Sequence, residues 1–419
     1  MKLSGWGNFP KNKITITNSF SLKSIVYGNG RSYGDSSTGE TTYINNSKGI
    51  VKFSLLDKKI TVHSGTTFDE ILKYIVPKGF FLPTTPGTKY LTAGGAVASD
   101  VHGKNHHKVG SFGNFVSKIV LDTGEDTKVL TLIKNSNLFK ATIGGMGLTG
   151  LIKEIEFSVI PIKSSFILRR RIITLNLLDT FKAFDRISDT ENSVAWIDCL
   201  AKGKKMGRSI IDYGNFDNSN NKLSVHKKPF INIPFFFPSF FLRKWFVRIF
   251  NSIYYRLGKF NNTEKSVHYD EFFYPLDKVL NWNKIYGKKG FIQYQFVVEK
   301  KRSFKVVSEC MEIISEYGIA SFLCVLKEFG NIPSRGLLSF PMEGYTLALD
   351  IPISNKTFEL VEKLNVIVKK NHGKIYLSKD SSLEDLNLVS NKKNLTEFKK
   401  IRKLYNFKFE SFQSKRLGL

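Results

Sequence analysis

Three glycine-rich clusters lie within the first 150 residues, and they constrain the fold more than any other feature of the sequence. Glycine accepts left-handed backbone conformations and lets main-chain amides approach an anion closely. The first cluster, GNGRSYGD at residues 28–35, follows the apolar pair Ile25-Val26, and no clean helix follows it. A run of amides of this kind can hold a pyrophosphate, although a simple turn cluster explains the same residues equally well.

The third cluster, at residues 144–150, contains a match to the dinucleotide fingerprint G-x-G-x-x-G at Gly145, Gly147 and Gly150. In the doubly wound nicotinamide-binding fold this fingerprint opens a helix. Here residues 151–157 alternate apolar and polar side chains, which is typical of a strand. The match is therefore accidental, and a nicotinamide-binding fold is disfavoured.

The middle cluster runs from residue 86 to residue 113 and changes from small to polar residues along its length. Small side chains let the backbone lie flat against a large planar ligand. The histidines His102, His106 and His107 raise the question of a metal, but no Asp or Glu ligand accompanies them on a helix. We therefore expect no metal site. The alternative to metal binding is an ordinary structural role for His106 and His107.

Hydrophobic periodicity predicts an α+β chain of three parts. Residues 1–164 are expected to bind a cofactor, residues 165–370 to form a second, antiparallel-sheet domain for the substrate, and residues 371–419 to return to the first part. Residues 83–114 are expected to contain little helix. Strands are predicted at 50–54, 60–64, 116–122, 153–159, 166–174 and 292–298, and helices at 67–76, 304–317 and 357–370.

The net charge of +27 indicates an anionic partner. A phosphorylated substrate, an anionic membrane surface and a nucleic acid all fit, and compositional drift in a chain rich in Lys and Asn is the plain alternative. The basic residues are spread along the chain, and no nucleic-acid motif is present. We therefore expect no nucleic-acid partner.

Residues 227–260 mix aromatic and basic side chains, a composition that suits the interface of an anionic bilayer. Within this segment, residues 229–242 carry no charge but are about 14 in number, short of the roughly 20 that a membrane-spanning helix needs. The prolines Pro229, Pro234 and Pro238 would also break a helix. The segment predicts peripheral membrane association, with packing into the core of the second domain as the alternative.

Three widely spaced cysteines and an N-terminus without the apolar core of a signal peptide indicate a reducing compartment. We expect a cytoplasmic protein at the inner face of the cell membrane.

Taken together, the three glycine clusters resemble the vanillyl-alcohol-oxidase (PCMH) type of FAD protein, and in particular its noncovalent members that act on polyprenyl-phosphate-linked pentoses. The run HGKNHHKVGSFGN at residues 102–114 is the most specific part of the resemblance. One departure is the short stretch of residues 16–26, where the family usually has a helix. The resemblance continues through residues 290–298, 322–330, 338–353 and 374–382, and so covers nearly the whole chain.

The resemblance implies a noncovalent FAD. Relatives with covalent flavin often carry a histidine at the position of Arg31, and arginine cannot form that bond. The residues that match the family's FAD contacts are Gly28, Asn29, Gly30, Arg31, Ser32, Tyr33, Gly34, Asp35, Gly87, Thr92, Ala93, Gly94, Gly95, Ser99, Asp100, His102, Gly103, Ile152 and Tyr376.

The resemblance also places Lys379 in catalysis. Oxidation of an alcohol needs a hydride acceptor, which no side chain provides, and a base for the hydroxyl proton. A partly buried lysine among other cations can act as that base. His102 is the second candidate, and a surface role for Lys379 is the plain alternative. The residues that match the family's substrate pocket are Lys104, Gln293, Gln295, Lys327 and Lys379.

The implied reaction is oxidation of the C2′ hydroxyl of the pentose to a keto sugar. It would form the first half of an epimerisation in cell-envelope polysaccharide synthesis, completed by a short-chain reductase partner. The alternative is a flavin-dependent oxidase or dehydrogenase of a soluble sugar, alditol or lactone.

Overall fold

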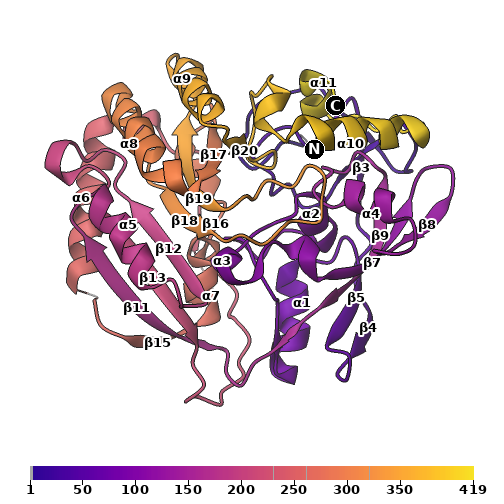
Figure 1. The fold of residues 1–419 in the computed structure, drawn as a ribbon, viewed down its shortest axis with the longest axis horizontal. Helices are drawn as coiled ribbons and strands as arrows, with labels where there is room; N and C mark the ends of the chain where they lie inside the picture. The colour runs from indigo at the N-terminus through magenta and orange to yellow at the C-terminus, as the bar shows by residue number, and fades with distance from the viewer. Residues whose placement is uncertain (1–2, 230, 261, 320) are drawn as a thin grey trace.

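The computed structural model describes residues 3–229, 231–260, 262–319 and 321–419. It is built on a five-stranded sheet and an eight-stranded antiparallel sheet, which lie side by side in Figure 1. Helices pack on both, so the predicted α+β class is confirmed. The five-stranded sheet has the order β4 (Ile50–Ser54), β5 (Lys59–His63), β9 (Leu151–Ser158), β7 (Val116–Asp122) and β8 (Thr127–Leu130).

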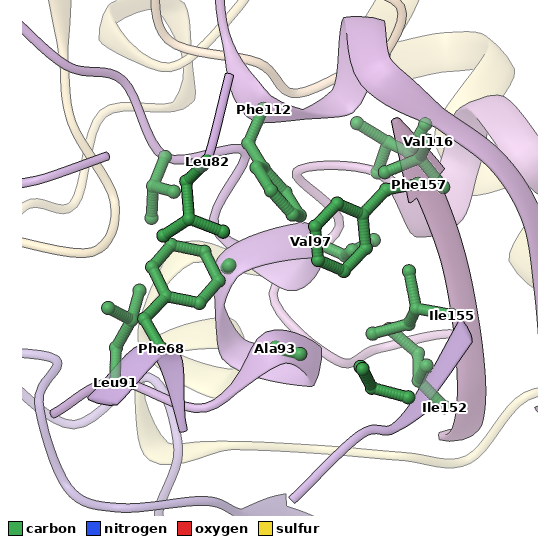
Figure 2. Packing of buried hydrophobic residues seen from close by; sticks show 14 of the residues in the cluster. Phe68, Leu82, Leu91, Ala93, Val97, Phe112, Val116, Ile152, Ile155 and Phe157 are labelled. Carbon is green, nitrogen blue, oxygen red and sulfur yellow. The ribbon is translucent and has the colours of Figure 1, made fainter. Parts of the chain in front are cut away.

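The core behind the five-stranded sheet combines aliphatic side chains with aromatic rings (Figure 2). Phe112 packs against Phe68 and Phe157, with ring centroids 5.3 Å and 5.0 Å apart. Phe68 opens α1 (Phe68–Ile75), whose N-terminus is fixed by reciprocal hydrogen bonds between Thr67 and Glu70. The strands predicted at residues 50–54 and 60–64 are present and pair as a hairpin, and the predicted helix at residues 67–76 is confirmed.

The stretch from residue 83 to residue 114 was expected to contain little helix, and it contains two short α-helices, α2 (Ala93–Ala98) and α3 (His106–Val109). The Thr92 hydroxyl caps α2 by accepting a hydrogen bond from the Gly95 amide at 3.1 Å. The small side chains of this helix let its backbone lie close to β9 and β5. Because α2 is rich in glycine, its sequence did not predict a helix.

The first glycine cluster directly follows β2 (Ile25–Tyr27). This strand belongs to a small parallel sheet, in which β3 (Thr41–Ile44) lies between β1 (Thr15–Thr17) and β2. No helix lies in residues 18–24, all of which the structure describes, in keeping with the short stretch seen in the sequence. The residues after β2 therefore leave the sheet directly as a loop. The remaining short elements of this half are β6 (Phe80–Phe81), β10 (Ile160–Pro161) and α4 (Ser136–Thr142).

The eight-stranded sheet has one face covered by helices α5 (Leu177–Arg186), α8 (Lys300–Tyr317) and α9 (Thr357–Lys370), which pack on the alternate apolar residues of its strands. The other face is free of these helices. Its strands run in the order β15 (Lys265–His268), β11 (Phe166–Thr174), β13 (Ser209–Phe216), β12 (Asn192–Ile197), β18 (Cys324–Phe329), β19 (Gly344–Pro352), β17 (Phe291–Glu299) and β20 (Lys374–Ile375).

The C-terminal segment returns to the five-stranded half, where its yellow helices lie beside the indigo N-terminal chain in Figure 1. Phe398 of α10 (Lys392–Leu404) joins the same core as Phe68. Arg416 of α11 (Phe412–Leu417) forms an ion pair with Asp35 at 2.9 Å. This contact links the end of the chain to the loop of the first glycine cluster.

The aromatic, basic segment at residues 227–260 forms β14 (Ile231–Asn232), a 3-10 turn at Ser239–Leu242 and α6 (Lys244–Phe260). Phe230 lies outside the described residues. No helix of the described chain is long and apolar enough to cross a membrane. Near this segment lie β16 (Val279–Leu280), which pairs with β14, and α7 (Tyr269–Phe273).

Candidate active site

A cavity of about 1200 Å³ lies between the glycine clusters and the open face of the eight-stranded sheet. Two halves can be distinguished by what lines them. One half is walled by loop backbone of the first two glycine clusters, and the other by side chains of the sheet and of α6. The predicted site residues on its wall are Gly28, Asn29, Gly30, Arg31, Ser32, Tyr33, Gly87, Thr92, Gly94, Gly95, Ser99, His102, Gly103, Lys104, Ile152, Gln293, Gln295, Lys327, Tyr376 and Lys379.

Four residues predicted to hold the cofactor, Gly34, Asp35, Ala93 and Asp100, are not on the described wall. They support it from behind. Asp35 pairs with Arg416, and Asp100 accepts hydrogen bonds from Ser111 Oγ and the Gly113 amide, both at 2.8 Å. A side chain at Gly34 would place its Cβ 2.0 Å from the Asp380 carbonyl oxygen, so close packing of backbone requires glycine there.

The loop-walled half fits a large cofactor that carries phosphates. The Ser36 hydroxyl, which is buried on the wall, and the neighbouring Ser37 hydroxyl have no hydrogen-bond partner among the described residues. Buried hydroxyls normally have a hydrogen-bond partner, so these two are available to a bound ligand. At Gly28 a Cβ would lie 2.7 Å from Thr92 Oγ1, which keeps the first loop bare and close to α2.

Arg31 is held by aromatic rings instead of by a carboxylate. Its guanidinium lies 4.1 Å from the Trp6 ring centroid and 5.5 Å from that of Tyr90. Its buried Nε has no hydrogen-bond partner in the described structure. The side chain therefore presents a fixed cation at the edge of the loop-walled half.

Three lysines, Lys104, Lys327 and Lys379, line the cavity, and Lys104 and Lys379 are close enough to Lys327 to repel its charge. Burial lowers the pKa of Lys379 to about 7, and the negative charge of Asp350 opposes that shift. Burial, helped by repulsion from Lys379 and Lys104, also lowers the pKa of Lys327 to about 7. Burial lowers the pKa of Lys104 to about 8. Such a group of cations, short of anionic partners, favours binding of an anion.

Lys379 is positioned by an aromatic ring and lies in the field of a buried carboxylate. Its ammonium lies 3.9 Å from the ring centroid of Tyr33. Asp350 is fully buried on β19 and accepts hydrogen bonds from Gln293 Nε2 at 2.6 Å and from Tyr286 Oη at 3.1 Å. Burial raises the pKa of Asp350 to about 7. Sequence reasoning missed Asp350, because its place opposite Gln293 depends on the β17–β19 register, which no local pattern in the sequence predicts.

His102 is buried on the wall with its two nitrogens in different environments. Gln295 Nε2 donates to His102 Nε2 at 3.1 Å and to Thr346 Oγ1 at 3.0 Å. His102 Nε2 is thus the acceptor, and the proton sits on Nδ1, which has no partner among the described residues. Burial, with repulsion from Lys327, holds the pKa of His102 well below its usual value. The imidazole is neutral and can donate a hydrogen bond through Nδ1.

The other two histidines of the middle cluster turn away from such a role. His106 packs on Phe329 with ring centroids 4.3 Å apart, and His107 Nε2 lies 2.7 Å from the Thr190 carbonyl oxygen. The third glycine cluster does reach the cavity, through Met146, Gly147 and Gly150. Strand β9 follows this cluster directly, as its alternating pattern predicted.

Comparisons with known proteins agree with this geometry. The FAD binding domain family matches residues 12–133. The chain is 34% identical over 376 residues to the decaprenylphosphoryl-beta-D-ribose oxidase of Mycolicibacterium smegmatis, covering 85% of this chain and 80% of that protein. It is 26% identical over 382 residues to an uncharacterised protein in the mprA 5′ region of Streptomyces coelicolor, covering 84% of this chain and 100% of that one.

A further relative shares only part of the chain. The D-lactate dehydrogenase of Anaerostipes hadrus is 31% identical over 163 residues, which is 38% of this chain and 34% of that protein. The likeness to the ribose oxidase, by contrast, spans most of both chains. The chain belongs to the family of the mycobacterial decaprenylphosphoryl-beta-D-ribose oxidase, and it is an FAD-dependent oxidoreductase of the PCMH type.

Proposed function

We propose that this protein oxidises the C2′ hydroxyl of a pentose attached to a polyprenyl phosphate, giving the 2′-keto sugar. The observation that carries the proposal is the lysine group between a loop-walled half and an apolar half of one cavity. A sugar phosphate with a lipid chain needs a cationic centre beside an apolar surface. The name of the mycobacterial relative describes a substrate of this kind.

We propose that residues 1–164 and 371–419 hold FAD and residues 165–370 hold the substrate. FAD supplies the hydride acceptor when it is bound. The backbone of residues 28–33 and the hydroxyls of Ser36 and Ser37 would hold its pyrophosphate. Arg31 supports noncovalent binding, since it offers no nucleophile for a flavin bond. Acid precipitation should release the flavin into the supernatant, and a yellow pellet would contradict this part.

Lys379 is proposed as the base that takes the hydroxyl proton. A base works best when its pKa lies near the working pH, and that of Lys379 is lowered to about 7. The charge of Asp350 keeps that pKa from falling further. His102 is less suited to the role, because Gln295 already occupies its free lone pair at Nε2. Its Nδ1 proton can instead orient an oxygen in the cavity.

The other substrate contacts follow from charge and position. Lys104 and Lys327 are proposed to bind the phosphate, and Gln293 and Gln295 the sugar. Lys104 is preplaced by a hydrogen bond to the Phe272 carbonyl and by the Phe272 ring, whose centroid lies 4.5 Å from its ammonium. Binding of an anion would offset the repulsion that lowers the pKa of Lys327.

The test is an anaerobic screen in which bleaching of the flavin absorbance reports substrate oxidation. Polyprenyl-phosphoryl ribose should bleach the flavin, and free ribose, alditols, lactones and lactate should do so far more slowly. Borohydride reduction of the product should give two sugars that differ only at C2′. Faster bleaching by a soluble substrate would overturn the proposal in favour of a soluble-sugar, alditol or lactone enzyme.

We also propose that the keto sugar passes to a short-chain reductase, which completes an epimerisation for a cell-envelope polysaccharide. A ketone at C2′ regains a hydroxyl of the opposite configuration only by reduction from the other face. A coupled assay with the reductase should yield the C2′ epimer as the single product. Release of the unreduced ketone as the end product in cells would contradict this step.

We further propose that α6 holds the protein on the inner face of the cell membrane. Trp245, Ile249, Ile253 and Phe260 recur at helical spacing and are exposed along one face of α6. Basic residues, among them Arg248 and Arg256, lie between them in the sequence. An apolar face flanked by cations suits an anionic bilayer.

Vesicle co-sedimentation tests this membrane contact. Ile249→Asp with Ile253→Asp removes two side chains that are each 51% exposed and do not line the cavity. Binding to phosphatidylglycerol vesicles should fall at least tenfold, while binding by Leu56→Asp with Ile133→Asp, a pair 95% exposed elsewhere, should not change. Equal loss in both pairs would point to general adhesion of exposed apolar residues and would sink the α6 contact.

A further inference from the structure

The half of the cavity away from the glycine clusters contains a continuous row of side chains across five strands. The strand registers place Ile210 opposite Trp196, Trp196 opposite Val325, Val325 opposite Ala348, and Ala348 opposite Gln295. All five residues line the cavity. Side chains directly opposite one another across paired strands share one face of a sheet. The row is therefore a single track on the open face.

The track begins at the reacting end of the cavity and leads away from it. Gln295 contacts His102, whereas Ile210 lies four strands further on. With neighbouring strands about 4.8 Å apart, the row spans about 19 Å. Apart from Gln295, its members are apolar or aromatic.

The roof of the track is aromatic as well. Tyr254 of α6 packs on Trp196 with ring centroids 4.7 Å apart, and Phe250 packs on Phe322 at 5.1 Å. Trp196 Nε1 donates to the Phe322 carbonyl at 3.0 Å, so the polar atom of the indole is already satisfied. What remains facing the cavity is ring carbon, which offers nothing to a sugar hydroxyl or a phosphate.

Charged residues do line the cavity near the track, but they are paired. Arg171 donates two hydrogen bonds to Asp212, at 2.7 Å and 2.8 Å. Arg169 lies 3.5 Å from Glu271. These neutralised pairs contrast with the three lysines, none of which forms an ion pair with a described carboxylate, although Asp350 and Asp212 act on Lys379 and Lys104 from a greater distance. An anion is therefore expected at the lysines and a hydrocarbon on the track.

We infer that the track binds the isoprenoid chain of the substrate, with its phosphate at the lysines and its first prenyl units along Ala348, Val325, Trp196 and Ile210. This inference rests on the proposed function and adds the place and direction of the chain. Phe250 and Tyr254 line the cavity, while Ile249 and Ile253 of the same helix face outward. The chain thus leaves the cavity along the helix that is proposed to contact the membrane.

The experiment compares substrates of different prenyl length in the FAD-loaded protein. With the wild type, KM should fall as prenyl units are added until the track is filled, and then level off. Val325→Phe narrows the track and should raise KM for the long-chain substrate at least tenfold, with kcat and with KM for a methyl-phosphoryl riboside changed less than twofold. Val366→Phe, at an exposed position on α9, is the matched control.

Trp196→Ala provides a second route in case Val325→Phe does not fold. It removes the largest surface on the track and should raise KM for the long-chain substrate about tenfold, since the prenyl chain would then bury less apolar surface. If both variants keep the flavin spectrum and the wild-type KM while the wild type prefers long chains, the track is wrong. If the wild type shows no chain preference at all, the lipid part of the proposed function fails instead.

Discussion

The two halves of the cavity differ in whether main chain or side chains form their walls. The loop-walled half, proposed to hold the flavin, is formed by main chain, and at Gly28 and Gly94 a Cβ would come within 2.7 Å and 2.9 Å of neighbouring side chains. The other half, proposed to hold the prenyl chain, is formed by side chains such as Trp196 and Val325, which project from regular strands. A wall of main chain fixes the shape of its ligand closely, whereas a wall of apolar side chains accepts a range of shapes.

The lysine group lies at the boundary between the two halves and belongs to neither wall. Lys379 follows β20, Lys327 lies on β18, and Lys104 lies within the middle glycine cluster. Three separate segments thus bring one ammonium each to the same place. Chemistry at the boundary depends on individual side chains, so a single substitution there should have the largest effect in the molecule.

Lys379→Met tests that expectation. The substitution keeps the length and apolar stem of the side chain but removes the proposed base, and loss of a positioned base typically costs 10²-fold to 10⁴-fold in rate. We expect kcat to fall at least 10²-fold while FAD remains bound with an unchanged visible spectrum. Lys393→Met, at an exposed lysine of α10, is the control. Turnover within fivefold of wild type would remove Lys379 from the mechanism.

A pair of substitutions tests the difference between the two walls directly. Gly28→Ala would place a methyl group 2.7 Å from Thr92 Oγ1, displacing the residue that caps α2. We expect FAD affinity to drop at least tenfold, measured by flavin retention on gel filtration. Trp196→Ala removes a far larger group from the other wall and should leave FAD affinity within twofold. Similar FAD loss in both variants would mean that the halves are not independent.

The same difference explains how far the site could be predicted from sequence. The flavin half is encoded by local patterns, because glycine and small residues have to stand next to one another where main chain meets a ligand. Gly28, Gly94 and Gly95 were accordingly found, and the structure places them on the cavity wall. Ala93 and Asp100 belong to the same pattern but support the wall from behind. A sequence motif predicts that a residue is needed near the site. It does not predict whether that residue lines the cavity or packs behind its wall.

The prenyl half has no local pattern. Ile210, Trp196 and Val325 are ordinary strand residues, and only the pairing of β13, β12 and β18 brings them into one row. Asp350 was missed for the same reason, since its link to Lys379 runs through the β17–β19 register and the turn after β20. Strand periodicity predicted β4, β5, β7, β9, β11 and β17, but it missed β12, β13, β18 and β19 and could not predict the order of the strands in the sheet. Pairing between strands that are distant in the sequence could not be predicted from local patterns.

The smallest expected effect concerns Asp350, which acts on Lys379 without serving as the base. Activity should rise with pH through about 7, as Lys379 loses its proton. The negative charge of Asp350 favours the protonated form of Lys379 and so raises its pKa against the effect of burial. In Asp350→Asn that charge is gone, the pKa of Lys379 falls further, and the acidic limb of the kcat profile should move to lower pH by about one unit.

Controls separate this electrostatic role from a structural one. Tyr286→Phe removes one hydrogen bond to Asp350 but keeps the carboxylate, so its limb should stay near that of the wild type. Asp350→Glu also keeps the charge, so its limb should likewise stay near that of the wild type. A structural role alone would lower kcat at every pH and leave the limb in place. An unmoved limb in Asp350→Asn, with FAD bound and the spectrum unchanged, would show that the field of Asp350 does not reach the base, and burial would then lower the pKa of Lys379 without any opposition from Asp350.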